Sequence, residues 1–225
     1  MIPYRSAIFD LDGVVVDTAQ HHYRAWQRLA RELGFALSPE TNERQKGVSR
    51  MASLDILLDS VGLFGLDRHT KLALAAQKNA WYLESLQGIG PNEALPGVRD
   101  LLAILKREGW KTAIASASKN ARFIIERLQM FNSFDAIVDG NMVERAKPDP
   151  EVFLEAARLT SAQAENCVVF EDAQAGIDGA VAAGMPVIGI GNPLSLKNAH
   201  WVIRGFPELD YQTLCRIVGV TDRIL

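Results

Sequence analysis

The segment Ser6-Ala-Ile-Phe-Asp10-Leu-Asp12-Gly-Val-Val-Val16 begins with an apolar run that stops abruptly at two aspartates. Residues 6–9 predict a short buried strand that ends just before the first aspartate. The valines that follow either continue this strand or begin a hairpin-like turn. Because ligands of open α/β sheets bind at the carboxyl ends of strands, the two aspartates are the first candidates for chemistry.

The next part of the chain, residues 17–90, predicts helices and no convincing strand. Its apolar residues recur at helical spacing, as in Tyr23, Trp26, Leu29 and Leu33. Two further helical patterns follow this one. We therefore expect a separate all-helical unit here.

Beyond residue 90 predicted strands and helices alternate. The strands are predicted at 112–115, 136–138, 167–170 and 186–190, and the helices at 98–108, 121–128, 150–158 and 173–183. Such alternation is typical of a parallel sheet with helices on both faces.

These patterns predict an α/β fold with a Rossmann-like, three-layer core. We assign residues 1–16 and 91–225 to this discontinuous core and residues 17–90 to an inserted helical cap domain. Both connections to the insert would lie beside the strand that precedes Asp10, where the insert can act as a lid. One continuous mixed domain is the alternative.

Composition narrows the class of protein. The chain has 225 residues, 48% of them hydrophobic, and a net charge of −3 from 24 basic and 27 acidic residues. Since no basic stripe is present, nucleic acid is not an expected partner. The apolar runs are too short to cross a membrane, no signal peptide is evident, and the two cysteines are too few for a disulfide framework. We expect a cytoplasmic monomer.

Chemistry-bearing residues follow four of the predicted strands. They are Asp10, Asp12, Ser116, Lys147, Glu171 and Asp172. In a parallel sheet these strand ends share one edge, where each close carboxylate pair would repel by ~4 kcal/mol at 4 Å and an effective dielectric of about 20. Such a cluster requires a cation, and oxygen ligands alone favour Mg²⁺, held by the four carboxylates, with a phosphate as its further partner.

Each of these residues suits a step of phosphoryl transfer. The carboxylate of Asp10 can be phosphorylated, which divides one difficult transfer into two. Asp12, two residues further along an extended segment, is the candidate general acid and base. Ser116 would hold phosphoryl oxygens, and the ammonium of Lys147 would stabilise their developing charge. Taken singly, an Asp-x-Asp turn or a Lys-Pro loop has an ordinary structural explanation.

Taken together, Asp10-Leu-Asp-Gly, Ser116, Lys147-Pro and Glu171-Asp resemble the haloacid dehalogenase superfamily of aspartyl-phosphate enzymes. Longer strings, among them Lys46-Gly-Val-Ser-Arg50, are similar to those of the β-phosphoglucomutase family. That resemblance implies a four-helix cap, Mg²⁺, and interconversion of β-D-glucose 1-phosphate and glucose 6-phosphate. It also implies β-glucose 1,6-bisphosphate as activator and intermediate.

The resemblance also implies residues that bind the sugar phosphate. They are Thr18, His22, Trp26, Lys46, Gly47, Arg50, Ser53, Lys78, Ala117, Ser118, Lys119 and Asn120. Among them Arg50 would hold the distal phosphate, because a guanidinium binds phosphate bidentately. From composition alone, the charged residues of the cap would be read as solvated surface. One departure from the family pattern is Ala173, where a serine is expected.

Other functions remain open at this point. A sugar-phosphate phosphatase would use the same core, with water attacking phosphorylated Asp10. A phosphonate-cleaving relative would need a cap lysine as a Schiff base and would lack the second aspartate, so Asp12 argues against it. A sugar-phosphate-binding protein without catalysis should show a gap in the catalytic set, and none is found.

Overall fold

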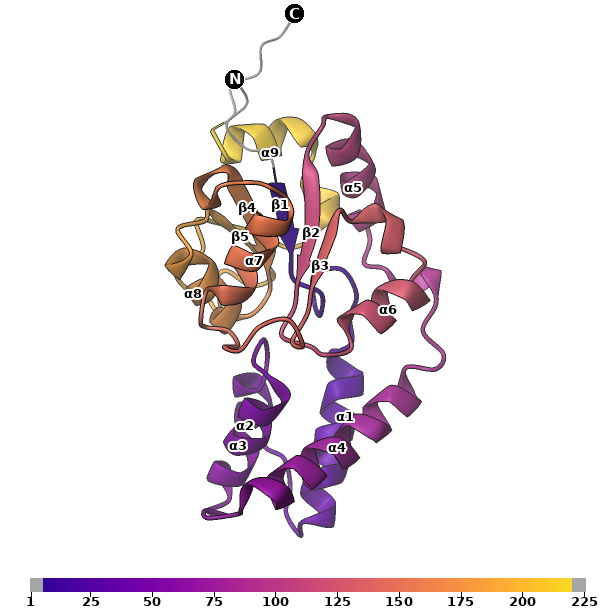
Figure 1. The fold of residues 1–225 in the computed structure, drawn as a ribbon, viewed down its shortest axis with the longest axis vertical. Helices are drawn as coiled ribbons and strands as arrows, with labels where there is room; N and C mark the ends of the chain where they lie inside the picture. Colours follow the sequence, from indigo (N-terminus) through magenta and orange to yellow (C-terminus); the bar gives the residue numbers. More distant parts are fainter. Residues whose placement is uncertain (1–5, 220–225) are drawn as a thin grey trace, which may run out of the picture.

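The computed structural model describes residues 6–219. Its centre is a parallel sheet with strand order β3-β2-β1-β4-β5-β6. The strands are β1 Ser6–Phe9, β2 Lys111–Ala115, β3 Ala136–Val138, β4 Cys167–Glu171, β5 Val187–Ile190 and β6 Trp201–Ile203. The α/β prediction is therefore confirmed, with β1 at the centre of the sheet between β2 and β4 (Figure 1).

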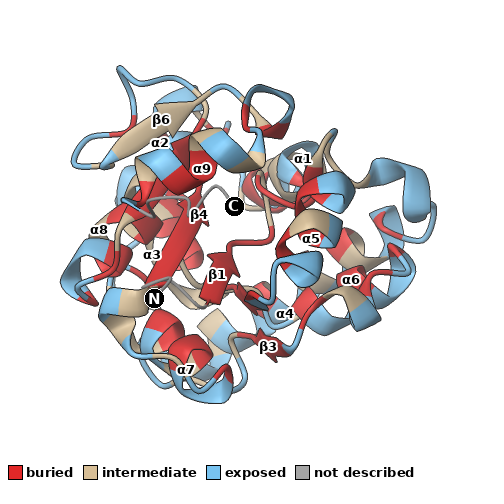
Figure 2. Cartoon of the chain, turned by 90° about the horizontal axis from the view of Figure 1, so that it is seen from above, coloured by how far each residue is buried: buried red, intermediate tan, exposed pale blue. Residues whose placement is uncertain are grey.

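Helices cover both faces of this sheet. Alternate residues of a strand point to opposite sides, and here the residues on both sides are apolar and buried. Ala7 and Phe9 belong to one hydrophobic cluster, with α5 Val98–Arg107, α6 Ala121–Arg127 and α9 Tyr211–Ile217. Ile8 belongs to another cluster, with α7 Glu151–Leu159 and α8 Gln174–Ala182. The central strands are buried on both sides (Figure 2), as a three-layer fold requires.

Four further helices lie outside this three-layer core, beyond the carboxyl ends of the strands (Figure 1). They are α1 Ala19–Glu32, α2 Pro39–Arg44, α3 Arg50–Ser60 and α4 Arg68–Ser85. A hydrophobic cluster of their own holds them together, with Trp26, Leu54 and Leu57 among its buried members. We call these four helices the cap. The boundaries at residues 16/17 and 90/91 stay a prediction.

The two segments that join cap and sheet lie side by side. Leu95 donates its backbone N–H to the carbonyl of Val15 at 2.8 Å, and Val16 forms an antiparallel bridge with Ala94. The valines of residues 14–16 thus form a buried turn rather than a longer β1. No described helix is long and apolar enough to cross a membrane.

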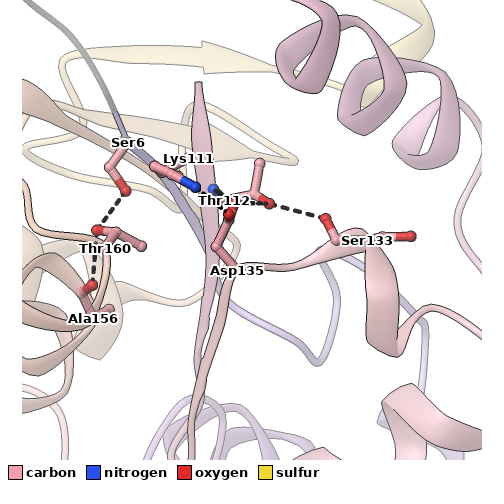
Figure 3. A network of polar contacts seen from close by, with 7 residues as sticks. All are labelled: Ser6, Lys111, Thr112, Ser133, Asp135, Ala156 and Thr160. Atoms are coloured by element: carbon pink, nitrogen blue, oxygen red, sulfur yellow. Dashed lines mark hydrogen bonds and ion pairs between the residues drawn. The ribbon is translucent and has the colours of Figure 1, made fainter. Parts of the chain in front are cut away.

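The amino ends of the strands are tied together by polar contacts (Figure 3). Ser6 donates to Thr160 at 2.9 Å, which links β1 to the end of α7. Asp135 accepts hydrogen bonds from both Lys111 and the backbone of Thr112, at 2.7 and 2.9 Å. These contacts fix the register of the sheet at the edge away from the cap, and the carboxyl edge is left to carry chemistry.

Candidate active site

A cavity of about 660 Å³ lies between the carboxyl edge of the sheet and the cap. Asp10 reaches it directly after β1, with its backbone N–H bonded to Phe170 of β4 at 2.9 Å. Asp172 reaches it directly after β4. A Cβ added to Gly13 would lie 2.0 Å from Oδ2 of Asp172, so the turn after β1 touches the loop after β4. Pairing of β1 with β4 therefore places these acids together.

Lys147 lies behind the cavity wall with a fully buried side chain. Its ammonium donates to Asp10 and, at 2.6 Å, to Oε1 of Glu171. Oε2 of Glu171 accepts the backbone N–H of Ala173 at 2.8 Å. Burial alone would lower the pKa of Lys147, but the two carboxylates outweigh it and raise that pKa. Glu171 is thus a partner of Lys147, and it does not line the cavity.

The other carboxyl groups are held where ionisation is unfavourable. Burial, helped by the charges of Glu171 and Asp12, raises the pKa of Asp10 to about 8 despite the opposing Lys147. Burial also raises the pKa of Asp12 and, together with Glu171 and Asp10, that of Asp172. Burial and mutual repulsion are the usual physical causes of such shifts, which are common at functional sites.

Asp12 and Ser116 are each held by a short local contact. The hydroxyl of buried Thr18, which precedes α1, donates to Oδ1 of Asp12. The hydroxyl of Ser116, at the end of β2, accepts the backbone N–H of Ser118 at 3.1 Å. The loop of residues 116–120 lines the cavity on the core side.

The cap contributes a buried cation to the opposite wall. The ammonium of Lys78, on α4, contacts Nδ1 of His22 at 2.8 Å and lies over the rings of Trp26 and Tyr82 at 4.6 and 4.7 Å. Burial and the charge of Arg50 lower the pKa of Lys78 to about 7. The pKa of His22 is also lowered, by burial and then by Lys78. Lys78 and His22 are therefore a part-buried, hydrogen-bonded pair in the cap wall.

The loop between α2 and α3 brings Lys46 and Gly47 to the cavity, and α3 begins there with Arg50. Lys46 is exposed and pairs with Glu43 at 2.7 Å. A Cβ on Gly47 would lie 2.8 Å from Cβ of Ala173, so here the cap rests directly on the core. The small side chain of Ala173, the one departure noted in the sequence, makes this contact. Burial lowers the pKa of the half-buried Arg50.

Most of the predicted residues line this one cavity. They are Asp10, Asp12, His22, Trp26, Lys46, Gly47, Arg50, Ser53, Lys78, Ser116, Ala117, Ser118, Lys119, Asn120 and Asp172. Thr18, Lys147 and Glu171 do not line it and act through hydrogen bonds to residues that do or to each other.

Sequence reasoning missed other residues of the wall. Asn79 accepts a hydrogen bond from Asn120 at 2.9 Å, across the junction of cap and core. Its position next to Lys78 was the signal that could have found it. Gln45 and the loop at 204–208 also line the cavity. The loop carries no motif, and only the docking of its short 3₁₀ helix beside the sheet edge brings it there.

The residues at the carboxyl edge of the sheet fit a divalent cation. The carboxyl groups of Asp10, Asp12 and Asp172, which follow β1 and β4, are among those that line the cavity, and such oxygen donors suit Mg²⁺. Within residues 6–219, no three acidic, His or Cys side chains already converge on a single point. The residues thus fit the ion by chemistry and adjacency, with Glu171 engaged elsewhere.

A parallel sheet with an aspartate pair after its central strand and a buried lysine beside the first aspartate defines a class of phosphoryl-transfer enzymes. The chain belongs to the haloacid dehalogenase-like hydrolase family, whose model matches residues 4–184. The resemblance seen in the sequence is thereby confirmed.

Relatives within this family divide between two activities. A β-phosphoglucomutase of Bacillus subtilis is 37% identical over 93% of both chains. The crystal structure of a β-phosphoglucomutase from Clostridium difficile superposes with a TM-score of 0.92 at 36% identity, covering 96% of this chain and 97% of that one. A phosphatase of phosphorylated carbohydrates from Thermotoga maritima is 30% identical, over 80% of this chain and 82% of its own.

Proposed function

We propose that this enzyme is a β-phosphoglucomutase, which interconverts β-D-glucose 1-phosphate and glucose 6-phosphate through a phosphorylated Asp10. The observation that carries the proposal is the two-sided cavity. Asp10 and Asp12 line it from the sheet, and Lys46 and Arg50 line it from the cap. A site with a reacting end and a distant cationic end suits a sugar that carries two phosphates in turn.

Asp10 is the phosphoryl carrier in this proposal. The phosphoryl group passes from Asp10 to the 6-hydroxyl of β-glucose 1-phosphate, whose proton goes to Asp12, giving the 1,6-bisphosphate. After the bisphosphate has turned round, its 1-phosphoryl group passes back to Asp10 and glucose 6-phosphate leaves with the proton from Asp12. The bond from Thr18 to Asp12 orients this acid and base.

Lys147 and the metal would neutralise charge at the reacting end. The ammonium of Lys147 already contacts Asp10 and is fixed by Glu171. Asp10, Asp12 and Asp172 would hold Mg²⁺, which when bound would stabilise negative charge on the transferring group. The loop at 116–120 would bind phosphoryl oxygens from the side of the sheet.

The cap decides between mutase and phosphatase in this proposal. Arg50 would hold the phosphate that is not reacting, and the aromatic and basic cluster of His22, Trp26 and Lys78 would support the closed arrangement. Contact of Gly47 with Ala173 would keep water from phosphorylated Asp10.

The test is turnover of β-glucose 1-phosphate with Mg²⁺ and a trace of the 1,6-bisphosphate, following glucose 6-phosphate and free phosphate in parallel. We expect glucose 6-phosphate without phosphate release, and no formation of glucose 6-phosphate in Asp10→Asn. Omission of Mg²⁺ should abolish turnover. Rapid release of free phosphate would instead identify a sugar-phosphate phosphatase, an activity that the 30% identity to the Thermotoga maritima phosphatase supports.

A further inference from the structure

Asn79 and Asn120 form a hydrogen bond across the junction of cap and core. The amide nitrogen of Asn120, which directly precedes α6, donates to Oδ1 of Asn79 on α4 at 2.9 Å. Both residues are half-buried, and both line the cavity. Other side chains of α4 bond within the cap, as Gln77 does to Glu32. Asn79 instead bonds α4 to the core.

This bond and the contact of Gly47 with Ala173 lie on opposite sides of Asp10. Asn120 ends the loop that follows β2, whereas Ala173 follows β4. The central strand β1, which ends just before Asp10, runs between β2 and β4. The cap therefore contacts the edge of the sheet on both flanks of the reacting carboxylate.

The bond also lies at the boundary of the cavity. A second groove runs between α4 and α6 and has Ala80, Leu83 and the exposed ring of Phe123 in its wall. This groove shares Asn120 with the cavity, and Asn79 lines the cavity. The two amides thus stand between the groove and the cavity, and their separation would admit water from this side.

We propose that Asn79 is a positioning residue, whose bond to Asn120 holds the cap to the core on the β2 side and keeps water from phosphorylated Asp10. This rests on the proposed function in taking Asp10 to carry the phosphoryl group. A single hydrogen bond between neutral amides is readily broken and remade, as entry of substrate and release of product require.

The first measurement is the distance between cap and core in solution. Spin labels would be attached in Asp59→Cys, at the exposed end of α3, and Ala103→Cys, on the exposed side of α5. The native Cys167 and Cys215 are buried. Electron–electron double resonance would then give the distribution of cap–core distances.

The variant to compare with the wild type is Asn79→Ala, which removes the acceptor and keeps a good helix former in α4. Gln77→Ala is the matched control, because it removes an amide from the same helix whose bond to Glu32, at 2.9 Å, stays within the cap. Asn120→Ala, alone and combined with Asn79→Ala, completes a double-mutant cycle.

We expect Asn79→Ala to raise the population with cap and core separated about fivefold, equivalent to about 1 kcal/mol. Gln77→Ala should leave the distribution unchanged. Asn120→Ala should act like Asn79→Ala, and the double variant should add nothing further. An unchanged distribution in Asn79→Ala, or effects of the two substitutions that simply add, would overturn the proposal.

The second measurement is phosphate release relative to formation of glucose 6-phosphate, in the turnover experiment. Asn79→Ala should raise this ratio about fivefold, and Gln77→Ala should not change it. A merely structural role of Asn79 would lower both products by the same factor. An unaltered ratio would therefore count against the inference as well.

The two measurements separate this inference from the proposed function. Rapid phosphate release by the wild type would reject the mutase, and the distance distributions would then decide alone whether Asn79 holds the cap. Formation of glucose 6-phosphate by the wild type, with the same distances in Asn79→Ala, would support the mutase and reject the role of Asn79.

Discussion

At the scale of single residues, the site depends on one buried ammonium. The side chains of Lys147 and Glu171 are both fully buried, and that of Asp10 is 8% exposed. Two carboxylates share this lysine, so its removal leaves them without a buried counter-charge. Loss of one partner of a buried ion pair strongly destabilises the fold, because the other charge is left buried without a counter-charge. The intact pair itself adds little stability.

We therefore expect Lys147→Met to lower the free energy of unfolding by about 3–5 kcal/mol. Urea unfolding at neutral pH would measure this. Lys111→Met is the matched control, since Lys111 forms a solvent-exposed pair with Asp135 at 2.7 Å and such pairs contribute about 0–1 kcal/mol. Equal effects of the two substitutions would contradict our account of the buried pair.

Lys78 gives the protein a pH dependence. Because the folded state lowers its pKa from 10.5 to about 7, the unfolded chain binds more protons between these values. The stability linked to Lys78 is thus complete above pH 10.5 and is lost as the pH falls towards 7. From pH 7 to 9, the wild type should gain stability relative to Lys78→Met, by at most about 1.4 kcal/mol per pH unit.

Urea titrations of both proteins at pH 7, 8 and 9 would measure this difference. A difference in stability that stays constant across this range would show that Lys78 titrates as an ordinary exposed lysine.

At the scale of elements, the cap and core meet at a glycine. Gly47 has a φ of +72°, and a Cβ there would lie 2.8 Å from Ala173. Gly65, also in the cap, has a similar φ of +83° but nothing within 4 Å of such a Cβ. Alanine at either position strains the backbone by about 1–2 kcal/mol. Only at Gly47 would the added methyl group also collide with the core and displace the cap from it.

We expect Gly47→Ala to lower kcat/KM for the sugar phosphate about tenfold and to raise phosphate release relative to transfer. Gly65→Ala should leave both quantities unchanged while lowering the melting temperature similarly. Turnover and thermal unfolding, measured in parallel on the two variants, would distinguish an effect of the contact with Ala173 from an effect of backbone strain. If kcat/KM fell equally in both, backbone strain and not the contact would be responsible.

The elements that sequence patterns missed are short. α2, Pro39–Arg44, has only polar residues after its proline and hence no apolar period, although Ser38 caps it by accepting from Thr41 at 3.1 Å. β6, Trp201–Ile203, has three residues, which pair with β5 and pack against the hydrophobic clusters of the core. α9, Tyr211–Ile217, spans seven residues. Tertiary contacts, not local propensity, stabilise elements of this length.

At the scale of the whole molecule, the cap helices have a hydrophobic cluster of their own, but not a fully separate one. Ala25 of α1 and Tyr82 of α4 belong to the cluster that includes Phe9 of the central strand. Leu57 of α3, by contrast, is fully buried inside the cap cluster. The far part of the cap should therefore open independently of the sheet, while its base remains attached.

We expect Leu57→Ala to remove about 2–5 kcal/mol from the local stability of the cap, because it leaves a cavity in a closed apolar cluster. Hydrogen exchange should accelerate in α1 and α3 and stay unchanged in β1 and β4. Val169→Ala, in a fully buried position of β4, is the matched control and should affect the sheet. Uniform acceleration in both variants would argue for one cooperative domain and against the proposed division.

The amino-acid sequence was sufficient to predict the class of fold and several residues that line the cavity. Alternating strand and helix patterns are sufficient to predict a parallel sheet. Because the carboxyl ends of its strands share one edge, the sequence also predicts that Asp10, Ser116 and Asp172 lie together, and all three line the cavity. The fold was needed to show that Glu171 contacts Lys147 outside the cavity and that Gln45 and Asn79 belong to the cavity wall. Periodicity fixes which face of an element a residue lies on, whereas pairing of buried charges and docking of loops depend on segments far apart in the chain.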